Sequence, residues 1–178
     1  MERSQRSDLR LAPWSEEGGP ALLARFNTPE MTAHLGGPET PEKLAERHLR
    51  YLRLGDKGRM FRITLDGETA GSIGYWETTW QGETVWETGW GVLPEFQGRG
   101  VAADAARLII REARAADRHA FLHAFPATDN GASNGVCRKA GFTLRGEALI
   151  EYPKGRWHPC NDWRYALSDG DAAPRAGG

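Results

Sequence analysis

The glycine-rich segment at residues 92–102 is the part of the chain whose residue types and spacing indicate the most specific chemistry. It reads VLPEFQGRGVA, an apolar strand that passes through a proline turn into the start of a helix. The first N–H groups of a helix have no acceptor within it, and the helix dipole adds positive potential there. Gly98 and Gly100 lack a Cβ, so a ligand can approach the main chain closely. We therefore predict a binding site for a phosphate or diphosphate group.

Two other interpretations of this segment exist. Gly98, Gly100 and Ala103 also match the glycine pattern of dinucleotide-binding proteins, and a lone pattern of this kind also occurs in ordinary loops. Dinucleotide binding requires an acidic residue about 20 positions further on, which binds a ribose. The chain has FLHA at residues 121–124 and no acid there. A dinucleotide site is therefore the less favoured alternative.

A second motif lies downstream, and it consists of Asn130, Ser133, Val136, Lys139 and the pair Gly141-Phe142. Together with Gln97-x-x-Gly100-x-Ala102, it resembles the GNAT superfamily of acyl-CoA N-acyltransferases. The likeness is greatest to the RimJ/RimL branch, which acetylates protein N-termini and includes small-molecule acetyltransferases. The resemblance covers nearly the whole chain, and it implies acetyl-CoA as cosubstrate without a metal.

In this family the fourth and fifth strands splay apart, and the gap holds the pantetheine arm of the cosubstrate. The resemblance implies that the main chain of Gly91, Val92 and Leu93 pairs with this arm. It further implies that Asn130 forms a hydrogen bond with the cosubstrate, and that Ser133 contacts the cosubstrate or donates a proton to the departing thiolate. The diphosphate would bind to the corner itself, at Gln97, Gly98, Arg99, Gly100, Val101 and Ala102.

Acyl transfer from a thioester to an amine requires that the amine lose a proton and that the departing thiolate regain one. Glu87 is the first candidate base, because the resemblance places it on the strand that meets the thioester. Trp76, Trp86 and Trp90 are near it in sequence and would raise its pKa by excluding water. His123 is the alternative base, although either residue could instead be structural.

The candidate acid is less clear from the sequence. Many relatives carry a tyrosine seven residues after the asparagine, but this chain has Cys137, which we interpret as a small buried apolar residue. Ser133 is then the remaining candidate, and a main-chain amide near Val92 would form the oxyanion hole. The missing tyrosine keeps open a catalytically silent module that only binds acyl-CoA.

These residues must be positioned by an α/β (α+β) fold. Runs of antiparallel strands with one βαβ crossover predict a mixed, mostly antiparallel sheet of six to seven strands with about four helices. The resemblance adds the splay between strands 4 and 5. We expect strands at 8–12, 60–65, 69–78, 84–93, 119–125, 142–152 and 157–167, and helices at 20–26, 41–54, 98–116 and 133–140.

Composition excludes several classes of protein. The chain has 178 residues and a formal net charge of −1, which argues against nucleic acid or an acidic membrane surface as partner. Cys137 and Cys160 are its only cysteines, which suits a reducing cytoplasm and predicts no metal site. We expect flexible ends at 1–7 and 169–178 around a single domain at 8–168. The acceptor would be a peptide N-terminus or a small-molecule amine, and the family resemblance allows a homodimer.

Overall fold

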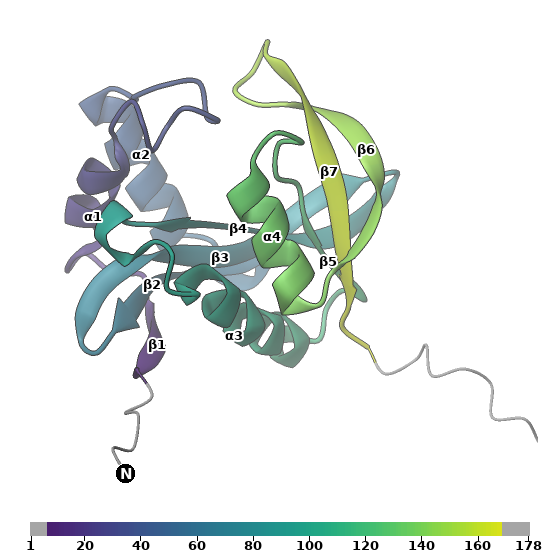
Figure 1. Ribbon diagram of the computed structural model, residues 1–178, viewed down its shortest axis with the longest axis horizontal. Helices are drawn as coiled ribbons and strands as arrows, with labels where there is room; N and C mark the ends of the chain where they lie inside the picture. The colour runs from purple at the N-terminus through teal and green to yellow at the C-terminus, as the bar shows by residue number, and fades with distance from the viewer. Residues whose placement is uncertain (1–6, 169–178) are drawn as a thin grey trace, which may run out of the picture.

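The computed structural model describes residues 7–168, so the predicted flexible ends lie, apart from Ser7, outside the described residues. Strands and helices follow in the predicted order (Figure 1). The strands are β1 (Leu9–Pro13), β2 (Gly58–Leu65), β3 (Glu68–Trp80), β4 (Glu83–Val92), β5 (Phe121–Ala124), β6 (Thr143–Glu151) and β7 (Trp157–Ala166). The helices are α1 (Gly19–Phe26), α2 (Pro41–Leu52), α3 (Val101–Ala116) and α4 (Gly131–Ala140), with 3-10 turns η1 (Gly55–Lys57) and η2 (Pro94–Phe96).

The seven strands form one sheet in the order β1-β2-β3-β4-β5-β7-β6. Only β4 and β5 are parallel, and the other neighbours are antiparallel, which confirms the predicted mixed sheet. Two-residue turns at Asp66-Gly67 and Gln81-Gly82 have positive φ at both positions, as the tight turns of twisted hairpins require. These turns fix the register of β2, β3 and β4.

Successive side chains of β3 and β4 point to opposite faces of the sheet, and the two faces differ. Ile73 and Trp86 are fully buried on one face, where the core also includes Ile109 of α3. Burial of each such side chain stabilises the fold by roughly 1.5–3 kcal/mol. Figure 1 shows α3 and α4 in front of the sheet. Glu87 and Gly91 point to the opposite face, where the Phe26 ring of α1 lies 3.2 Å from the position a Cβ on Gly91 would take.

Several element boundaries differ from the predicted ones, and two of the differences have a clear local reason. The third helix begins at Val101 rather than at residue 98, because Gly98 and Gly100 adopt left-handed backbone angles. The last helix begins at Gly131 rather than at residue 133, because the Asn130 side chain accepts from the Ser133 N–H and caps it. Strand β5 has only residues 121–124, shorter than the predicted 119–125.

Helix α2 buries His48 in place of two of its leucines. His48 is buried and accepts at Nδ1 from the Trp14 indole at 3.0 Å, while its Nε2 lies 2.9 Å from Glu16 Oε2. Leu49 and Leu52 are instead exposed by 41% and 37%. A histidine with both ring nitrogens paired can replace an aliphatic side chain in a core. Within residues 7–168, every helix is too short or too polar to cross a bilayer.

Candidate active site

An open edge of β4 is the main feature of the candidate site. Strands β4 and β5 pair only at Trp86↔Leu122 and Glu87↔His123, although β4 continues to Val92. The N–H of Leu93 donates to Ala70 O at 2.8 Å, on the β3 side. Because antiparallel hydrogen bonding alternates, the main-chain groups of Thr88, Trp90 and Val92 turn away from β3. This edge can accept an extended, amide-bearing arm as an additional strand.

The same alternation distinguishes the three residues expected to pair with pantetheine. Val92 faces the open edge, and its carbonyl accepts from Gln97 Nε2 at 2.9 Å. Leu93 uses its N–H for Ala70 and its carbonyl for the Phe96 N–H, at 2.9 Å for the latter. Gly91 turns its carbonyl to β3, since a Cβ on Gly71 would lie 2.1 Å from Gly91 O. The main-chain groups that face the open edge therefore belong to Trp90 and to the N–H of Val92, and the sequence patterns did not single out Trp90.

The glycine corner adjoins the end of this edge. Gly98 and Gly100 have φ of 76° and 75°, a conformation that favours glycine, and a Cβ on either would have no atom within 4 Å. Gly100 is the N-cap of α3 and makes no side-chain cap bond. The N–H groups of Val101 and Ala102 then lack an intrahelical acceptor. The buried Val101 side chain fixes the corner on the core, and the open space suits a diphosphate group.

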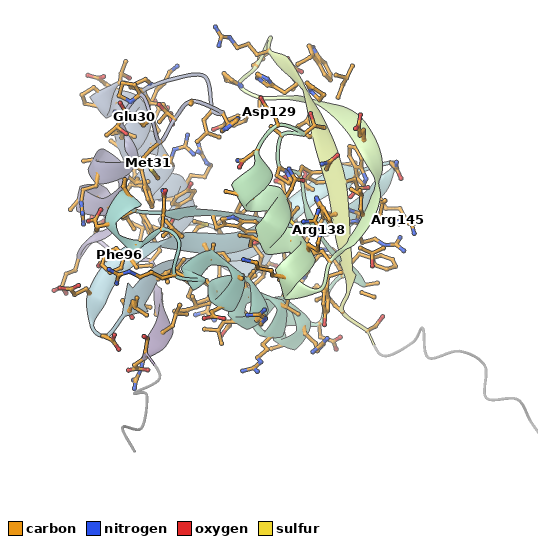
Figure 2. The ribbon with its side chains drawn as sticks, in the orientation of Figure 1. Glu30, Met31, Phe96, Asp129, Arg138 and Arg145 are labelled. Carbon is orange, nitrogen blue, oxygen red and sulfur yellow. The ribbon has the colours of Figure 1, made fainter. Side chains whose placement is uncertain are left out.

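Two side chains of the corner have specific neighbours. Gln97 Nε2 lies 3.8 Å from the sulfur of Met31, so the loop after α1 contacts the corner; Figure 2 labels Met31 and Phe96 in this region. The Arg99 guanidinium lies 5.5 Å from the centre of the Phe96 ring. Arg99 also borders a hollow of about 460 Å³ between β1 and the start of α3, together with Ser7, Leu9, Leu65, Asp66, Val101 and Asp104.

The start of α4 is held by hydrogen bonds of the buried Asn134 side chain. Asn134 donates to the carbonyls of Ala127 and Asn130, at 2.9 and 2.8 Å. Its Oδ1 accepts from Asn161 and from the Trp163 indole, each at 2.8 Å. Asn130 itself is occupied in capping the helix, and Ser133 is half-buried on its first turn. Asn134, which the sequence motif did not single out, therefore fixes the loop that carries Asn130, and Figure 2 labels its neighbour Asp129.

Glu87 is half-buried on the face opposite α3. The Trp76 indole donates to Glu87 Oε2 at 2.5 Å across the β3–β4 pair. Burial raises the pKa of the Glu87 carboxyl above its ordinary value, and the Trp76 hydrogen bond opposes this in part. The expectation that Trp86 and Trp90 also surround Glu87 is wrong, because alternation places both on the other face. Trp86 packs there against Tyr75 and His119, with ring centres 4.9 and 4.6 Å apart.

The raised pKa of Glu87 predicts a pH-dependent stability. A carboxyl whose pKa is higher in the folded than in the unfolded state stabilises the fold most below its unfolded-state pKa. That contribution is lost as the pH rises through the folded-state pKa. We expect the free energy of unfolding of the wild type, relative to Glu87→Gln, to fall as the pH rises from about 4 to 8. Urea denaturation across this range measures it.

Glu83→Gln is the matched control for this prediction, because Glu83 lies on the same strand and is exposed. The difference in the free energy of unfolding between the wild type and Glu83→Gln should change little over the same pH range. A pH-independent difference for Glu87→Gln would contradict the assignment of burial as the cause of the shift.

The alternative base, His123, lies beside Glu87 in the register of β4 and β5. It is buried, with 5% of its surface exposed, and its Nδ1 lies 2.6 Å from Asp162 Oδ1 on β7. The Trp80 indole donates to the other oxygen of Asp162 at 3.1 Å. The sequence patterns did not connect Asp162 to the site, because it comes from a strand far along the chain.

Cys137 is fully buried in the core, and burial raises the pKa of its thiol to about 12. A thiol with so high a pKa supplies little thiolate near neutral pH. The interpretation of Cys137 as a small apolar residue agrees with this placement. Within residues 7–168, no cluster of three histidine, cysteine or acidic side chains is arranged to hold a metal ion.

Comparison with known proteins places the fold and the family. Residues 8–143 match the family model of the acetyltransferase (GNAT) domain. No curated protein matches the chain.

Solved acetyltransferase structures share the fold. One, from Salmonella typhimurium, modifies the N-terminal serine of the 50S ribosomal protein L7/L12; its TM-score is 0.73 at 21% identity, over 90% of this chain and 95% of that one. RimL, a ribosomal L7/L12 alpha-N-protein acetyltransferase in complex with coenzyme A, has a TM-score of 0.72 at 20% identity, over 89% and 93%. The aminoglycoside acetyltransferase AAC(6')-Ib in complex with coenzyme A has a TM-score of 0.75 at 16% identity, over 89% of this chain and 95% of that one. Because the family model spans most of the sequence, the chain is an acetyltransferase of the GNAT family.

Proposed function

We propose that the protein transfers the acetyl group of acetyl-CoA directly to a primary amine. The observation that carries the proposal is the open edge of β4 with the glycine corner at one end and Glu87 at the other. The main-chain groups of Trp90, which face the open edge, suit the amides of the pantetheine arm. The N–H groups at the start of α3 suit the diphosphate. Acetyl-CoA would supply the activated acetyl thioester where β4 and β5 part.

Glu87 accepts the proton of the incoming amine, directly or through one water molecule. A lysine-like amine has a pKa about three units above neutral pH, so its deprotonation costs about 4–5 kcal/mol. A protein N-terminal amine has a pKa near 7.7–8.0, and the cost falls to about 1 kcal/mol. The burial that raises the pKa of Glu87 makes its carboxylate a stronger base.

Two roles remain, protonation of the departing thiolate and support of the carbonyl oxygen. The Ser133 hydroxyl, on the first turn of α4, is the candidate for returning a proton to the departing thiolate. A main-chain N–H on the open edge, at Val92, supports the carbonyl oxygen as it gains charge. The amine lone pair attacks the thioester carbon, the N–C bond forms, and the C–S bond breaks. The second proton lost by the nitrogen balances the one that the thiolate gains.

The acceptor class is either a protein N-terminus or a small-molecule amine. The solved relatives include an enzyme that modifies the N-terminus of L7/L12 and one that acetylates aminoglycosides. We keep both acceptor classes as candidates, and the assay below distinguishes them.

A thiol-release assay tests the function. The protein is incubated with acetyl-CoA and either peptides with free N-termini, the same peptides with blocked N-termini, or a set of aminoglycosides and polyamines. Release of coenzyme A with a free amine, above the rate in water alone, is expected. Binding of acetyl-CoA without release for any amine would contradict the proposal and favour a module that only binds acyl-CoA.

A further inference from the structure

His123, Asp162 and Trp80 form a buried hydrogen-bonded chain on the same face of the sheet as Glu87. The side chains of His123 and Asp162 are 6% and 9% exposed, and their closest atoms are 2.6 Å apart. Trp80 contacts Asp162 and also packs on Phe125, whose ring stacks in turn on the His123 imidazole at 5.6 Å. The hydrogen bond to Asp162 therefore fixes the orientation of the His123 ring in its own plane, and the stacked Phe125 ring packs against its face.

The hydrogen bonds determine which nitrogen of His123 carries the proton. An indole N–H can only donate, so Asp162 Oδ2 accepts from Trp80. The ionised carboxylate has acceptors only, so its Oδ1 must accept from an N–H on Nδ1 of His123. In the neutral imidazole Nε2 then carries a lone pair. Among the described residues Nε2 has no hydrogen-bond partner, and it does not belong to the fully buried unpaired nitrogens, which are those of Arg62, Trp86 and His158.

The free Nε2 lies at the point where β4 and β5 separate. His123 is the register partner of Glu87, and neighbouring strands are about 4.8 Å apart. Glu87 is held from behind by Trp76 through Oε2, as His123 is held by Asp162 through Nδ1. Within residues 7–168, each residue thus keeps one acceptor atom free, Oε1 on Glu87 and Nε2 on His123. Arg164, the β7 register partner of His123, directs its guanidinium to the Phe121 ring, 4.1 Å away.

We propose that Asp162 is a positioning residue that holds His123 in the Nδ1–H tautomer, so that Nε2 accepts a hydrogen bond from the amine to be acetylated. The inference rests on the proposed function. The ammonium gives one proton to Glu87, and the neutral amine then donates one of its two remaining N–H groups to Nε2. Its lone pair is directed away from both acceptors, toward the thioester carbon. After attack the nitrogen loses a second proton, which balances the one that the thiolate regains, and the proton taken by Glu87 is released to solvent.

The opposite tautomer would oppose the reaction. An N–H on Nε2 would donate to the amine lone pair and occupy the electrons needed for attack. Asp162→Asn produces this state, since its amide oxygen still accepts from Trp80 and its NH₂ donates to His123 Nδ1. The imidazole must then carry its proton on Nε2. The substitution has nearly the same size, so packing is retained.

Two measurements test the proposal. In the first, ¹⁵N NMR of the imidazole at pH 8 assigns the tautomer of His123, and we expect Nδ1–H in the wild type and Nε2–H in Asp162→Asn. In the second, kcat/KM for the amine should fall about 10- to 100-fold in Asp162→Asn, as expected when a hydrogen bond is lost and its donor is left without a partner. The Kd for acetyl-CoA should be unchanged, and Asp56→Asn, whose carboxylate is 81% exposed, should keep the wild-type values.

A double-mutant cycle separates positioning from general stability. If Asp162 acts through His123, the pair His123→Gln with Asp162→Asn is no slower than His123→Gln alone. Additive losses, a wild-type rate in Asp162→Asn, or an Nε2–H tautomer in the wild type would each overturn the proposal. Failure of the proposed function appears differently, as absence of thiol release by the wild type with every amine, and in that case the NMR tautomer still decides the role of Asp162.

Discussion

Replacing Gly100 with tryptophan is expected to weaken acetyl-CoA binding by at least about 100-fold, because the side chain fills the space in front of the α3 amides. Loss of two hydrogen bonds to a charged phosphate corresponds to roughly 3–6 kcal/mol. Gly100 also has φ of 75°, which a tryptophan rarely adopts. Isothermal titration calorimetry with acetyl-CoA measures the change in Kd.

Gly82→Trp is the matched control for this experiment. Gly82 has φ of 81° and, like Gly100, no atom within 4 Å of a built Cβ, but it lies in the β3–β4 turn. The two variants therefore carry the same kind of backbone strain, and only one carries a blocked corner. Gly100→Ala adds a smaller side chain should the tryptophan variant fail to fold, and it should still weaken binding. Normal acetyl-CoA affinity in folded Gly100 variants would refute the diphosphate assignment.

Replacing Glu87 with glutamine is expected to lower kcat by about 100-fold or more, the usual contribution of a general base. The amide oxygen of glutamine still accepts from the Trp76 indole, so the fold of the β3–β4 pair is retained. The amide cannot take up a proton from the amine. Initial rates at saturating acetyl-CoA and amine, between about pH 6 and 9, give kcat.

The affinity for acetyl-CoA should be nearly unchanged in Glu87→Gln, because no contact with the donor is removed. Glu83→Gln, on the exposed end of the same strand, should leave kcat unchanged. A wild-type kcat for Glu87→Gln across the pH range would remove Glu87 from the reaction. The base would then have to be sought elsewhere, and His123 lies next to it in register.

Local signals in the sequence account for much of the fold. The pair Gln81-Gly82 predicts a two-residue turn, and such a turn places Trp80 opposite Glu83 and therefore Trp76 opposite Glu87. Gly141, directly after the helical residues 133–140, is a typical C-cap residue, and its φ of 93° is that of a left-handed C-cap. Turn and cap residues act through the backbone of their nearest neighbours, so their effects can be read without knowing the rest of the chain.

The parts that escaped prediction depend on long-range pairing. Asp162 reaches His123 because β7 inserts between β5 and β6, an order that no local pattern encodes. The hydrogen-bonding direction of Trp90 requires the exact pairing of Leu93 with Ala70. Trp86 and Glu87 are adjacent in sequence, but their side chains lie on opposite faces of the sheet. Closeness along the chain therefore wrongly predicted that Trp86 contacts the carboxylate.

The short contact between β4 and β5 has a geometric consequence. Two register positions, one of them the fully buried pair Trp86 and Leu122, join the β1–β4 half of the sheet to the β5–β7–β6 half. Because Glu87 and His123 occupy the second of these positions, the same pairing that joins the two halves also sets the spacing of the two proton acceptors. That spacing is therefore determined by the sheet and not by a loop. In the part of the chain that the structure describes, β4 has no partner on the β5 side beyond this pair, which leaves room for the donor.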